Sequence, residues 1–432
     1  MAASDMKVLI VARNASSRFG GEAFLPLKYF QILRRRGYPA QLIAHARNRD
    51  DLKESLAEWI EHVHFVEDSW LHRTIWRAGS LMPATIRDHV FGVVFNFIDE
   101  LYQAKIIRRL VRTGSVDIIH QPIPVSPRAP SGIYGFGVPV VIGPMNGNMD
   151  FPPGYDDYAG QSERLFKRFG RWVAIGAGRL VPGKRKAALL LVANERTLKG
   201  LPLEHGNVQL LVENGVDFSV FSRPEHRPHG TPGKLRLIFL GRLVSWKGLD
   251  FTLRAVALAR GAGLDVALDI VGEGDEAERL KILGDELGLG DQVRWHGFLP
   301  QQQCAAMLAS CDVLILNSLY ECGGAVILEA MSQGLPVIAS DWGGPADYVD
   351  PDCGILVSPM PRDSFAERLS AAIAALAADP ELRQTLGNAA ALKVRAAYDW
   401  EHKVDHMIEH YLAVLPARHA NNADGPPPVS VR

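Results

Sequence analysis

The chain has 432 residues, too many for one ordinary hydrophobic core, and this length predicts two domains of roughly 200 residues each. Apolar residues make up 47% and charged residues 22% of the sequence, the proportions of a globular protein that folds in water. The formal net charge of -1 argues against a general nucleic-acid binder, for which a large basic excess is expected.

The cysteines and the N-terminus indicate the compartment. Cys304, Cys311, Cys322 and Cys353 lack any CxxC spacing, so we expect no metal site and no disulfide framework, and a reducing cytoplasm is the simplest location. The first residues contain only a brief apolar run, which predicts a buried strand rather than a signal peptide. No apolar run reaches the roughly 18 residues that cross a membrane, although peripheral contact stays open.

The N-terminal half opens with a predicted strand at 8–11, an amphipathic helix at 22–36 and a second strand at 41–44. Gly20 and Gly21 stand immediately before the helix, where backbone amides and the helix dipole attract an anion; an ordinary tight turn explains the same glycines. The following aromatic residues, 50–112, look less regular. They predict a lid or plain core, with an acceptor pocket as the alternative.

Two further predicted strands end in segments of interest. The strand at 116–120 ends in His120, at the place where ligands bind in such sheets, although a lone histidine equally fits the core. The strand at 138–142 leads into GPMNGNMDFPPGY, which is either a binding element or a structural Ω-loop. Residues 163–186 are basic and partly aromatic, which fits peripheral contact with an anionic bilayer or, more simply, a solvated face.

A polar stretch rich in Pro, Gly and His divides the chain, and a stricter alternation of strands and helices follows it. Alternation at this spacing implies parallel strands, right-handed crossovers and helices on both faces, hence an α/β protein of two doubly wound domains. The predicted strands are 189–193 and 208–212 before the division and 235–240, 266–271, 293–295, 313–316 and 337–339 after it. The predicted units are a first domain at 1–218, a linker at 219–233, a second domain at 234–398, a last helix at about 399–415 and a disordered tail at 418–432.

Two loops of the second domain carry cations or glycines beside a predicted helix start. Arg242 and Lys247 follow the strand end at Gly241 and suit a clamp on a pyrophosphate, with two exposed surface cations as the alternative. The VGEGDE turn, which contains Gly272, suits the wall of a base or ribose site, or is merely a turn.

The most informative stretch is NSLYECGGAVILEAMSQGLPVIASDWGGPADY, residues 317–348, in which two successive strands end in glycine loops. Glu329, on the predicted helix, can accept hydrogen bonds from both hydroxyls of a ribose. Glu321, in the loop before it, suits the hydroxyls of a sugar carried on a diphosphate. The two glutamates are not spaced as the acid and base of a hydrolase.

E-C-G-G-A-V-I-L-E, from Glu321 to Glu329, resembles the E-x7-E motif of retaining glycosyltransferases of family 4. Similar motifs follow in order along nearly the whole chain: GGEAF, VDIIH, ENGVD, GRLVSWKG, VGEG, LEAMSQGLPVIAS and a final W-E-x-K-V helix. The resemblance implies the GT-B fold, in which two Rossmann-like domains face each other across a cleft and the last helix returns to the first domain. It implies transfer of a hexose-type sugar from a nucleotide-diphosphate donor to an acceptor hydroxyl, with retention, without a metal or other cofactor.

The resemblance also implies roles for individual residues. Arg242 and Lys247 would neutralise the diphosphate leaving group, Glu329 would hold the ribose, and Glu321 with nearby backbone amides would hold the donor sugar. His120 would lie beside the reacting sugar. The implied catalytic residues are therefore His120, Glu321, Arg242 and Lys247, and the implied donor site comprises Gly20, Gly21, Gly241, Arg242, Lys247, Gly272, Glu321, Cys322, Gly323, Gly324, Ala325, Val326 and Glu329.

One departure and several alternatives limit the prediction. Where family members commonly have E-G-F-G, this chain has E-C-G-G, so Cys322 and Gly323 alter the pocket for the donor sugar and leave that sugar unspecified. We expect a UDP-sugar slightly ahead of a GDP-sugar, and a carbohydrate or lipid-linked acceptor. The alternatives are a nucleotide-sugar epimerase of the same fold, a phosphorylase, for which no cofactor lysine is evident, and a non-catalytic nucleotide-sugar binder.

Overall fold

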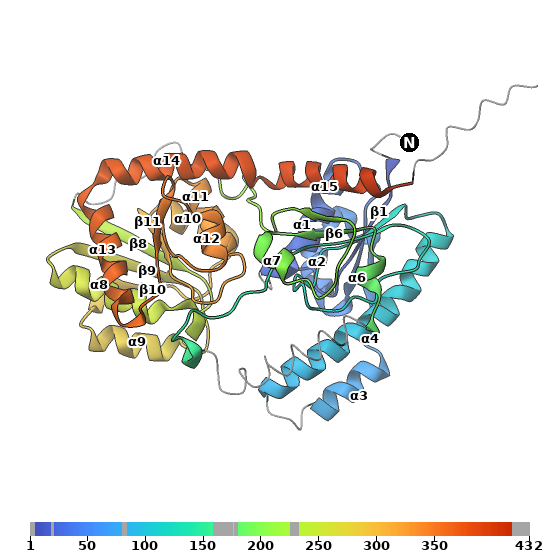
Figure 1. The fold of residues 1–432 in the computed structure, drawn as a ribbon, viewed down its shortest axis with the longest axis horizontal. Coiled ribbons are helices and arrows are strands. Elements are labelled where there is room, and N and C mark those ends of the chain that lie inside the picture. The colour runs from blue at the N-terminus through green and yellow to red at the C-terminus, as the bar shows by residue number, and fades with distance from the viewer. Residues whose placement is uncertain are drawn as a thin grey trace, which may run out of the picture.

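Two parallel sheets organise the chain, one in each of two domains that lie side by side (Figure 1). The computed structural model describes residues 5–18, 21–79, 84–158, 176, 180–224 and 233–416. Gly20, most of the basic segment 163–186, part of the expected linker and the tail 418–432 lie outside them. Within the described residues, no helix has both the length and the apolar character that crossing a bilayer requires.

The first domain contains a seven-stranded sheet in the order β3-β2-β1-β4-β5-β6-β7, and every pair of neighbours is parallel. Its strands are β1 (Val8–Val11), β2 (Gln41–His45), β3 (Val63–Val66), β4 (Ile118–Gln121), β5 (Val140–Met145), β6 (Leu189–Val192) and β7 (Val208–Leu210). Successive residues of β1 face opposite sides of the sheet, so Val8 and Ile10 belong to one apolar cluster and Leu9 and Val11 to another. Because both faces of the sheet are covered, β1 and β6 are continuous apolar runs.

The aromatic segment that looked irregular is regular secondary structure. It forms α2 (Arg49–Ser55), the 3-10 turn η3 (Ala57–His62), β3, α3 (Trp70–Gly79) and α4 (Ala84–Arg112), and α3 packs against α4. Trp59 lies against the core, whereas Trp70 is 68% exposed; the side chains of Trp76 and of residues 91–94 lie outside the described part. Sequence analysis missed β3 because its four residues include a histidine and offer too short a pattern to distinguish.

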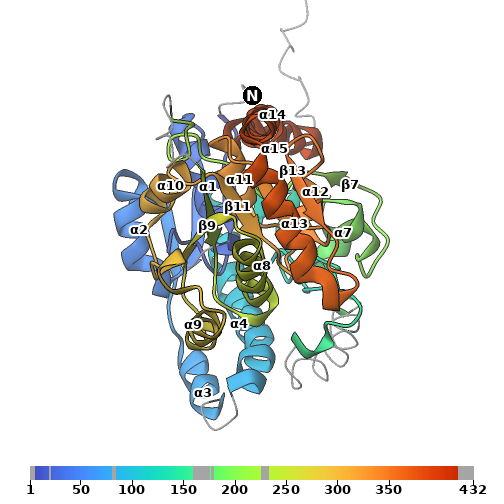
Figure 2. The same cartoon turned by 90° about the vertical axis from the view of Figure 1, so that its left-hand side faces the viewer.

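Other helices of the first domain are α1 (Gly21–Arg35), η2 (Ala46–Asn48), η4 (Asp156–Tyr158), α6 (Gly183–Lys186) and α7 (Glu195–Lys199). One face of the sheet is covered by α1 together with α15 (Trp400–Val414), whose Val404, Met407 and Tyr411 share a cluster with Phe30 of α1. The chain enters and leaves the second domain at neighbouring points, because Val216 N donates to Tyr398 O at 2.7 Å. Figures 1 and 2 show α14 and α15 running over the same side of both domains.

The second domain has a six-stranded parallel sheet in the order β10-β9-β8-β11-β12-β13. Its strands are β8 (Lys234–Leu240), β9 (Asp265–Val271), β10 (Val293–Trp295), β11 (Val313–Leu316), β12 (Val337–Ser340) and β13 (Gly354–Val357). The sheet has one strand more than the predicted ones, which end with 337–339, because β13 pairs with β12 at the edge. This strand begins with a glycine and spans four residues, so its pattern was too short to recognise.

Helices cover both faces of this sheet and a single apolar cluster fills the domain. They are η5 (Ser245–Lys247), α8 (Leu249–Gly261), α9 (Ala277–Glu286), η6 (Gly290–Gln292), α10 (Gln301–Ala309), α11 (Ala325–Ser332), α12 (Gly344–Tyr348), η7 (Arg362–Ser364), α13 (Phe365–Ala378) and α14 (Pro380–Ala397). In α14, Pro380 occupies the first turn and Asp379 caps it by accepting from Leu382 N at 2.9 Å, which explains the predicted break between two helices.

A segment of the first domain lies against the second. Residues 149–158, here called the strap, follow β5 and reach the lower side of the second domain (Figure 1). Tyr155 is fully buried in the second domain's cluster, and its Oη donates to Pro359 O at 2.6 Å. Phe151 stacks on Tyr320 with ring centroids 5.0 Å apart. The predicted Gly/Pro-rich loop is therefore a connection between the domains.

Candidate functional site

The carboxyl ends of the two sheets meet at the junction between the domains. Asn146, directly after β5, places its Nδ2 2.8 Å from the carbonyl oxygen of Cys322, in the loop after β11. Gly343, after β12, lies against Met149 of the strap, because a Cβ built on this glycine would stand 2.4 Å from Met149 Cε. Strands of a parallel sheet all end at the same edge, so both sheets present to this junction the edge where such folds bind ligands.

Lys247 and Glu321 meet at this edge. They form an ion pair, and their side chains are only 13% and 18% exposed. Asn317 ties their loops together, because its Nδ2 donates to Gly248 O at 2.6 Å. Gly248 adopts a φ of 65° as it enters α8, a conformation that favours glycine. The loop after β8 and the loop after β11 are thus held as one unit.

Arg242 lies in the same loop as Lys247 and is exposed, with its guanidinium 5.7 Å from the centroid of the Trp246 ring. Within the described residues, no carboxylate forms an ion pair with it. Gly241 and Gly272 bring two backbone segments together beside it, since a Cβ on Gly272 would lie 1.9 Å from Gly241 O. The edge therefore offers an exposed cation, a paired cation and closely packed loops.

The loop from Glu321 to Gly324 is packed from two sides. Gly344 N donates to Glu321 O at 2.7 Å, and a Cβ on Gly344 would stand 2.4 Å from Cys322 O. Gly323 has no room for a side chain, because its Cβ would lie 2.3 Å from Asn214 Nδ2. Gly324, with a φ of 92°, is the residue before α11. The two glycine pairs recognised in the sequence thus pack against each other.

Helix α11 carries the remaining predicted residues. Val326 is buried, and Ala325 and Glu329 are half-buried. Burial raises the pKa of Glu329 to about 7, and the described residues provide no charged group that offsets this shift. A half-buried carboxylate for which the described residues provide no charged partner is suited to accept hydrogen bonds from a ligand.

His120 ends the apolar part of β4 and points into the first domain. The ring is fully buried in the first domain, Nε2 donates to Gly143 O at 2.7 Å, and Nδ1 accepts from Tyr411 Oη at 2.6 Å. Burial lowers the pKa of His120 to about 4, with a smaller contribution from Lys403. Because both ring nitrogens bond to protein groups, the observed position favours a core histidine, the alternative that the sequence left open, over a place beside a reacting sugar.

Gly21, the described member of the first predicted glycine pair, is exposed at the start of α1 with a φ of 27°. The neighbouring Glu22 carboxyl has a pKa that burial raises, opposed by a hydrogen bond from the Val125 backbone. Glu22 also raises the pKa of Glu213 and Cys322, which places the start of α1 near the junction. Gly20 lies outside the described residues.

Sequence analysis missed several residues that join the domains. Arg196 of α7 forms an ion pair with Asp347 of α12 at 2.8 Å, and Asn194 Nδ2 donates to the same carboxylate at 2.8 Å. Asn146 Nδ2 donates to both Glu213 and Cys322. A cap pattern, N-E-R-T, marked the start of α7, but nothing in the pattern indicated a partner in the other domain.

A second polar cluster lies at the carboxyl edge of the first sheet. His45 and His72 face Asp99, with His72 Nε2 donating to Asp99 Oδ1 at 3.0 Å, and Arg13 Nε lies 2.8 Å from Asp99 Oδ2. Backbone N–H groups donate to Nδ1 of both histidines, from Ser69 at 3.1 Å and from Arg47 at 3.2 Å. Both rings therefore accept on Nδ1, and the cluster is held by these hydrogen bonds together with the ion pair between Arg13 and Asp99.

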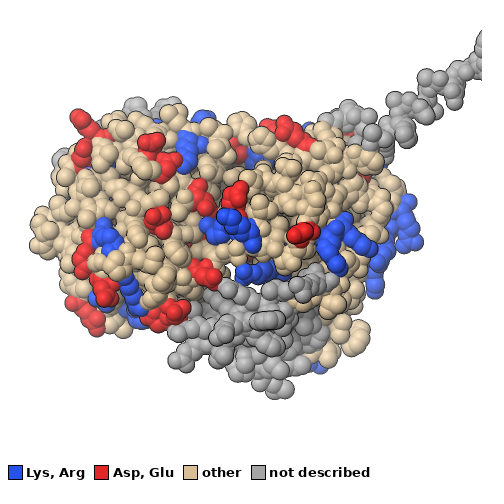
Figure 3. Space-filling model, in the orientation of Figure 1, with Lys and Arg blue, Asp and Glu red and all other residues tan. Residues whose placement is uncertain are grey.

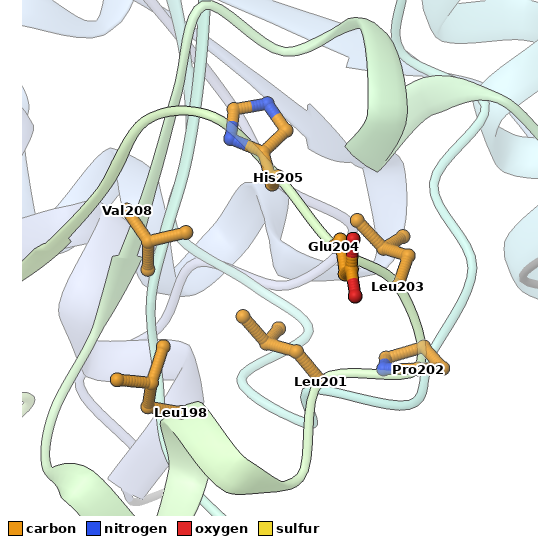
Figure 4. A pocket seen from close by; sticks show the side chains of 7 residues that line it. All are labelled: Leu198, Leu201, Pro202, Leu203, Glu204, His205 and Val208. Carbon is orange, nitrogen blue, oxygen red and sulfur yellow. The ribbon is translucent and has the colours of Figure 1, made fainter.

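Two hollows lie apart from the junction. One of about 520 Å³ lies by the edge strand β7 and is lined mainly by apolar side chains, among them Leu198, Leu201 and Leu203 (Figure 4). The other, about 740 Å³, lies along α8 and α13. Neither includes a predicted donor-site residue. Figure 3 shows acidic and basic side chains mixed over the second domain and at the junction, with basic ones more frequent at the outer end of the first.

Comparison with known proteins gives a family match over part of the chain. Residues 222–393 match the family model described as glycosyl transferases group 1. The D-inositol 3-phosphate glycosyltransferase of Arthrobacter sp. (strain FB24) is 32% identical over 254 residues, 56% of this chain and 58% of the relative. The 2-deoxystreptamine glucosyltransferase of Streptomyces kanamyceticus is 32% identical over 176 residues, 38% of this chain and 46% of the relative. The chain thus spans about half the length of the curated relatives it matches.

Solved structures match over nearly the whole chain. A sucrose-phosphate synthase from Thermosynechococcus elongatus aligns with a TM-score of 0.70 and 20% identity, covering 95% of this chain and 99% of that one. Anabaena HepE in complex with UDP-glucose aligns with a TM-score of 0.63 and 19% identity, covering 95% and 100%. At these identities the matches confirm the fold alone, the GT-B arrangement of two Rossmann-like domains.

Proposed function

Because residues 222–393 belong to glycosyl transferases group 1 and the whole chain has the GT-B fold, we propose that this protein is a glycosyltransferase that uses a nucleotide-diphosphate sugar. The observation that carries the proposal is the group formed by exposed Arg242 and the Lys247–Glu321 ion pair at the carboxyl edge of the second sheet. Two cations and one carboxylate match the two halves of such a donor, its diphosphate and its sugar hydroxyls.

The ion pair explains how the site is kept ready for the donor. Before the donor binds, Glu321 offsets the half-buried charge of Lys247. When the donor enters, Lys247 exchanges Glu321 for the diphosphate, and Glu321 is released to accept from hydroxyls of the sugar. Arg242 adds a second cation to the diphosphate. Both cations stabilise the negative charge that develops as the diphosphate leaves, which lowers the barrier to transfer.

The remaining roles follow from position. Glu329, on α11 behind the glycine loop, would accept from the ribose hydroxyls, as acidic residues do in many nucleotide sites. The amides of Gly323 and Gly324 would hold the donor sugar, and Ala325 and Val326 would line the start of the helix below it. In this proposal transfer proceeds with retention and the two cations perform the charge neutralisation, so activity does not require a divalent metal.

A UDP-sugar is the donor that we propose to test first. HepE, which shares the fold, is described in complex with UDP and with UDP-glucose. The acceptor is a hydroxyl of a carbohydrate or of a lipid-linked carbohydrate. The named relatives support this class, since they include glycosyltransferases whose names specify an inositol phosphate and a deoxystreptamine.

The test begins with UDP-, GDP-, ADP- and TDP-sugars in a thermal-shift screen, followed by calorimetry with the nucleotide that binds. Arg242→Ala and Lys247→Ala should each weaken binding by about 1 to 3 kcal/mol, the cost of losing a charge-assisted hydrogen bond. Lys281→Ala is the matched control, because Lys281 also pairs with a glutamate in the second domain but is exposed on the surface of α9. Unchanged affinity in both test variants would remove the clamp from the proposal.

Transfer is tested separately from binding. Glu321→Ala should reduce transfer far more than nucleotide affinity, because it removes a sugar contact while freeing Lys247 for the diphosphate. Product formation should persist in excess EDTA. Collapse of free-nucleotide affinity in Glu321→Ala, with turnover of bound donor intact, would contradict the assigned role. Product from donor alone, without acceptor, would indicate an epimerase instead.

A further inference from the structure

The side chain of Asn146, in the first domain, makes four hydrogen bonds. It follows β5, is 2% exposed, and uses both ends of its amide. The Nδ2 group donates to Glu213 Oε2 at 2.7 Å and to Cys322 O at 2.8 Å. The Oδ1 atom accepts from Asn194 Nδ2 at 3.2 Å and from Thr197 Oγ1 at 3.3 Å. A side chain of the first domain thus directly holds a carbonyl of the loop assigned above to the donor sugar.

Glu213 and Asn214 complete this contact. Glu213 is 7% exposed, and its backbone oxygen accepts from the Nζ of buried Lys403 on α15. Asn214 Nδ2 donates to Tyr348 Oη, of α12, at 3.1 Å. Both side chains border the space beside Gly323: a Cβ there would lie 2.3 Å from Asn214 Nδ2 and 3.1 Å from Glu213 Oε2.

Because Gly323 has no side chain, polar atoms of Glu213 and Asn214, in the segment that leaves the first domain, fill the space beside the loop. The loop position is set from outside the second domain, through one hydrogen bond to Cys322 O and a close polar contact at Gly323. Separation of the domains would break both contacts together, because Asn146, Glu213 and Asn214 all belong to the first domain or to the segment that leaves it.

We propose that Asn146, supported by Glu213, is a positioning residue that gives the Glu321–Gly324 loop its transfer-competent position only when the domains are closed. The inference rests on the proposed function, because it assumes that this loop holds the donor sugar. Asn146 acts through Cys322 O and the loop amides, and not on the diphosphate. Its loss should therefore affect turnover and leave nucleotide binding at Arg242 and Lys247 largely unchanged.

The first experiment compares Asn146→Ala with Asn207→Ala. Asn207 is a partly buried asparagine of the first domain, and its Nδ2 donates to Ala188 O within that domain. Asn146→Ala should lower kcat about 10- to 100-fold, the usual effect of misplacing a reacting group by about 1 Å. The Kd for UDP should change by less than about threefold. Equal kcat values for the two variants would overturn the proposal.

The second experiment does not depend on activity. Of the four cysteines, all within the described residues, Cys322 alone is not buried, so its reaction with a thiol reagent reports on the loop. Asn146→Ala should raise this rate about fivefold, as expected when one buried hydrogen bond that resists local opening is lost. An unchanged rate would overturn the proposal. If the wild-type protein transfers no sugar, the proposed function fails, but the labelling rate still decides whether Asn146 holds the loop.

A third measurement approaches the contact from the other side. Gly323→Ala places a methyl group against Asn214, and should lower kcat and raise Cys322 labelling in the same way. Adding Asn214→Ala makes room for the methyl group. The double variant should therefore recover at least part of the wild-type kcat and of the slower, wild-type rate of Cys322 labelling. This rescue also covers the case in which Asn146→Ala fails to fold. Absence of rescue, with both proteins folded, would contradict the assigned contact.

Discussion

Tyr155 is the residue through which the strap joins the second domain, and its truncation tests that connection. The ring is fully buried between Phe251 and Phe365, at centroid distances of 5.8 and 6.5 Å, and its Oη donates to Pro359 O at 2.6 Å. Removing a buried aromatic side chain costs about 3 to 5 kcal/mol. The lost hydrogen bond adds about 1 kcal/mol. Tyr155→Ala should therefore destabilise the second domain by about 4 kcal/mol or more, and Tyr155→Phe by about 1 kcal/mol.

Hydrogen exchange followed by mass spectrometry is the suitable assay, because it resolves the two domains, whereas a single unfolding transition does not. Amides of α8 and α13 that exchange through unfolding of the domain should speed up by about three orders of magnitude in Tyr155→Ala, at 1.4 kcal/mol per factor of ten. Amides of β1 and β4 in the first domain should change little. Tyr134→Ala, which truncates a half-buried tyrosine of the first domain, is the control.

The result that would refute the reasoning is specific. If α8 and α13 exchange at the wild-type rate in Tyr155→Ala, the strap does not contribute to the second domain's core. If exchange increases equally in both domains, the strap stabilises the whole chain and not the domain on which it lies. An effect of Tyr155→Phe as large as that of Tyr155→Ala would assign the stability to the hydrogen bond instead of to burial of the ring.

Two further predictions concern buried titratable groups. Burial raises the pKa of Glu329 to about 7 from 4.5, so the folded state retains a proton that the unfolded state loses, and the free energy of unfolding falls as pH rises through this window. In urea unfolding, the wild type should lose on the order of 2 kcal/mol of stability between pH 5 and 8 through this group, and Glu329→Gln should not show that loss. His120, whose pKa is lowered to about 4, should stay neutral in the folded state above pH 5. His120→Gln and Tyr411→Phe should each cost about 1 to 3 kcal/mol of stability and leave turnover per folded molecule within about threefold. A loss of turnover in a fully folded His120→Gln protein would show that the histidine takes part in the reaction.

Local sequence patterns predicted the sheets well. Four apolar residues at 8–11 and at 313–316 became β1 and β11 without change, and the alternation of strands and helices predicted parallel sheets in both domains. The failures, β3 and β13, are edge strands of four residues. A short edge strand is stabilised by pairing with a neighbour that is distant in sequence, so its own residues carry little information.

The glycines of the second domain were also predictable, because they reflect local geometry. Gly272, Gly344 and Gly323 each lie where a Cβ would meet another atom at 2.4 Å or less, and Gly248 and Gly324 adopt a positive φ. The pattern located these loops at the strand ends. The sequence pattern could not identify the residues that fill the space beside these loops.

The sequence by itself determined where the strands end and which loops carry cations, carboxylates and glycines, because these features depend on residues a few positions apart. Only the tertiary structure decided which of them meet. Asn146 and Cys322 are 176 positions apart, and His120 and Tyr411 are 291 apart. Whether a polar side chain at a strand end faces a ligand or the core depends on what packs over it, and here a helix from the far end of the chain buries His120 while the strap and Asn146 reach the other domain.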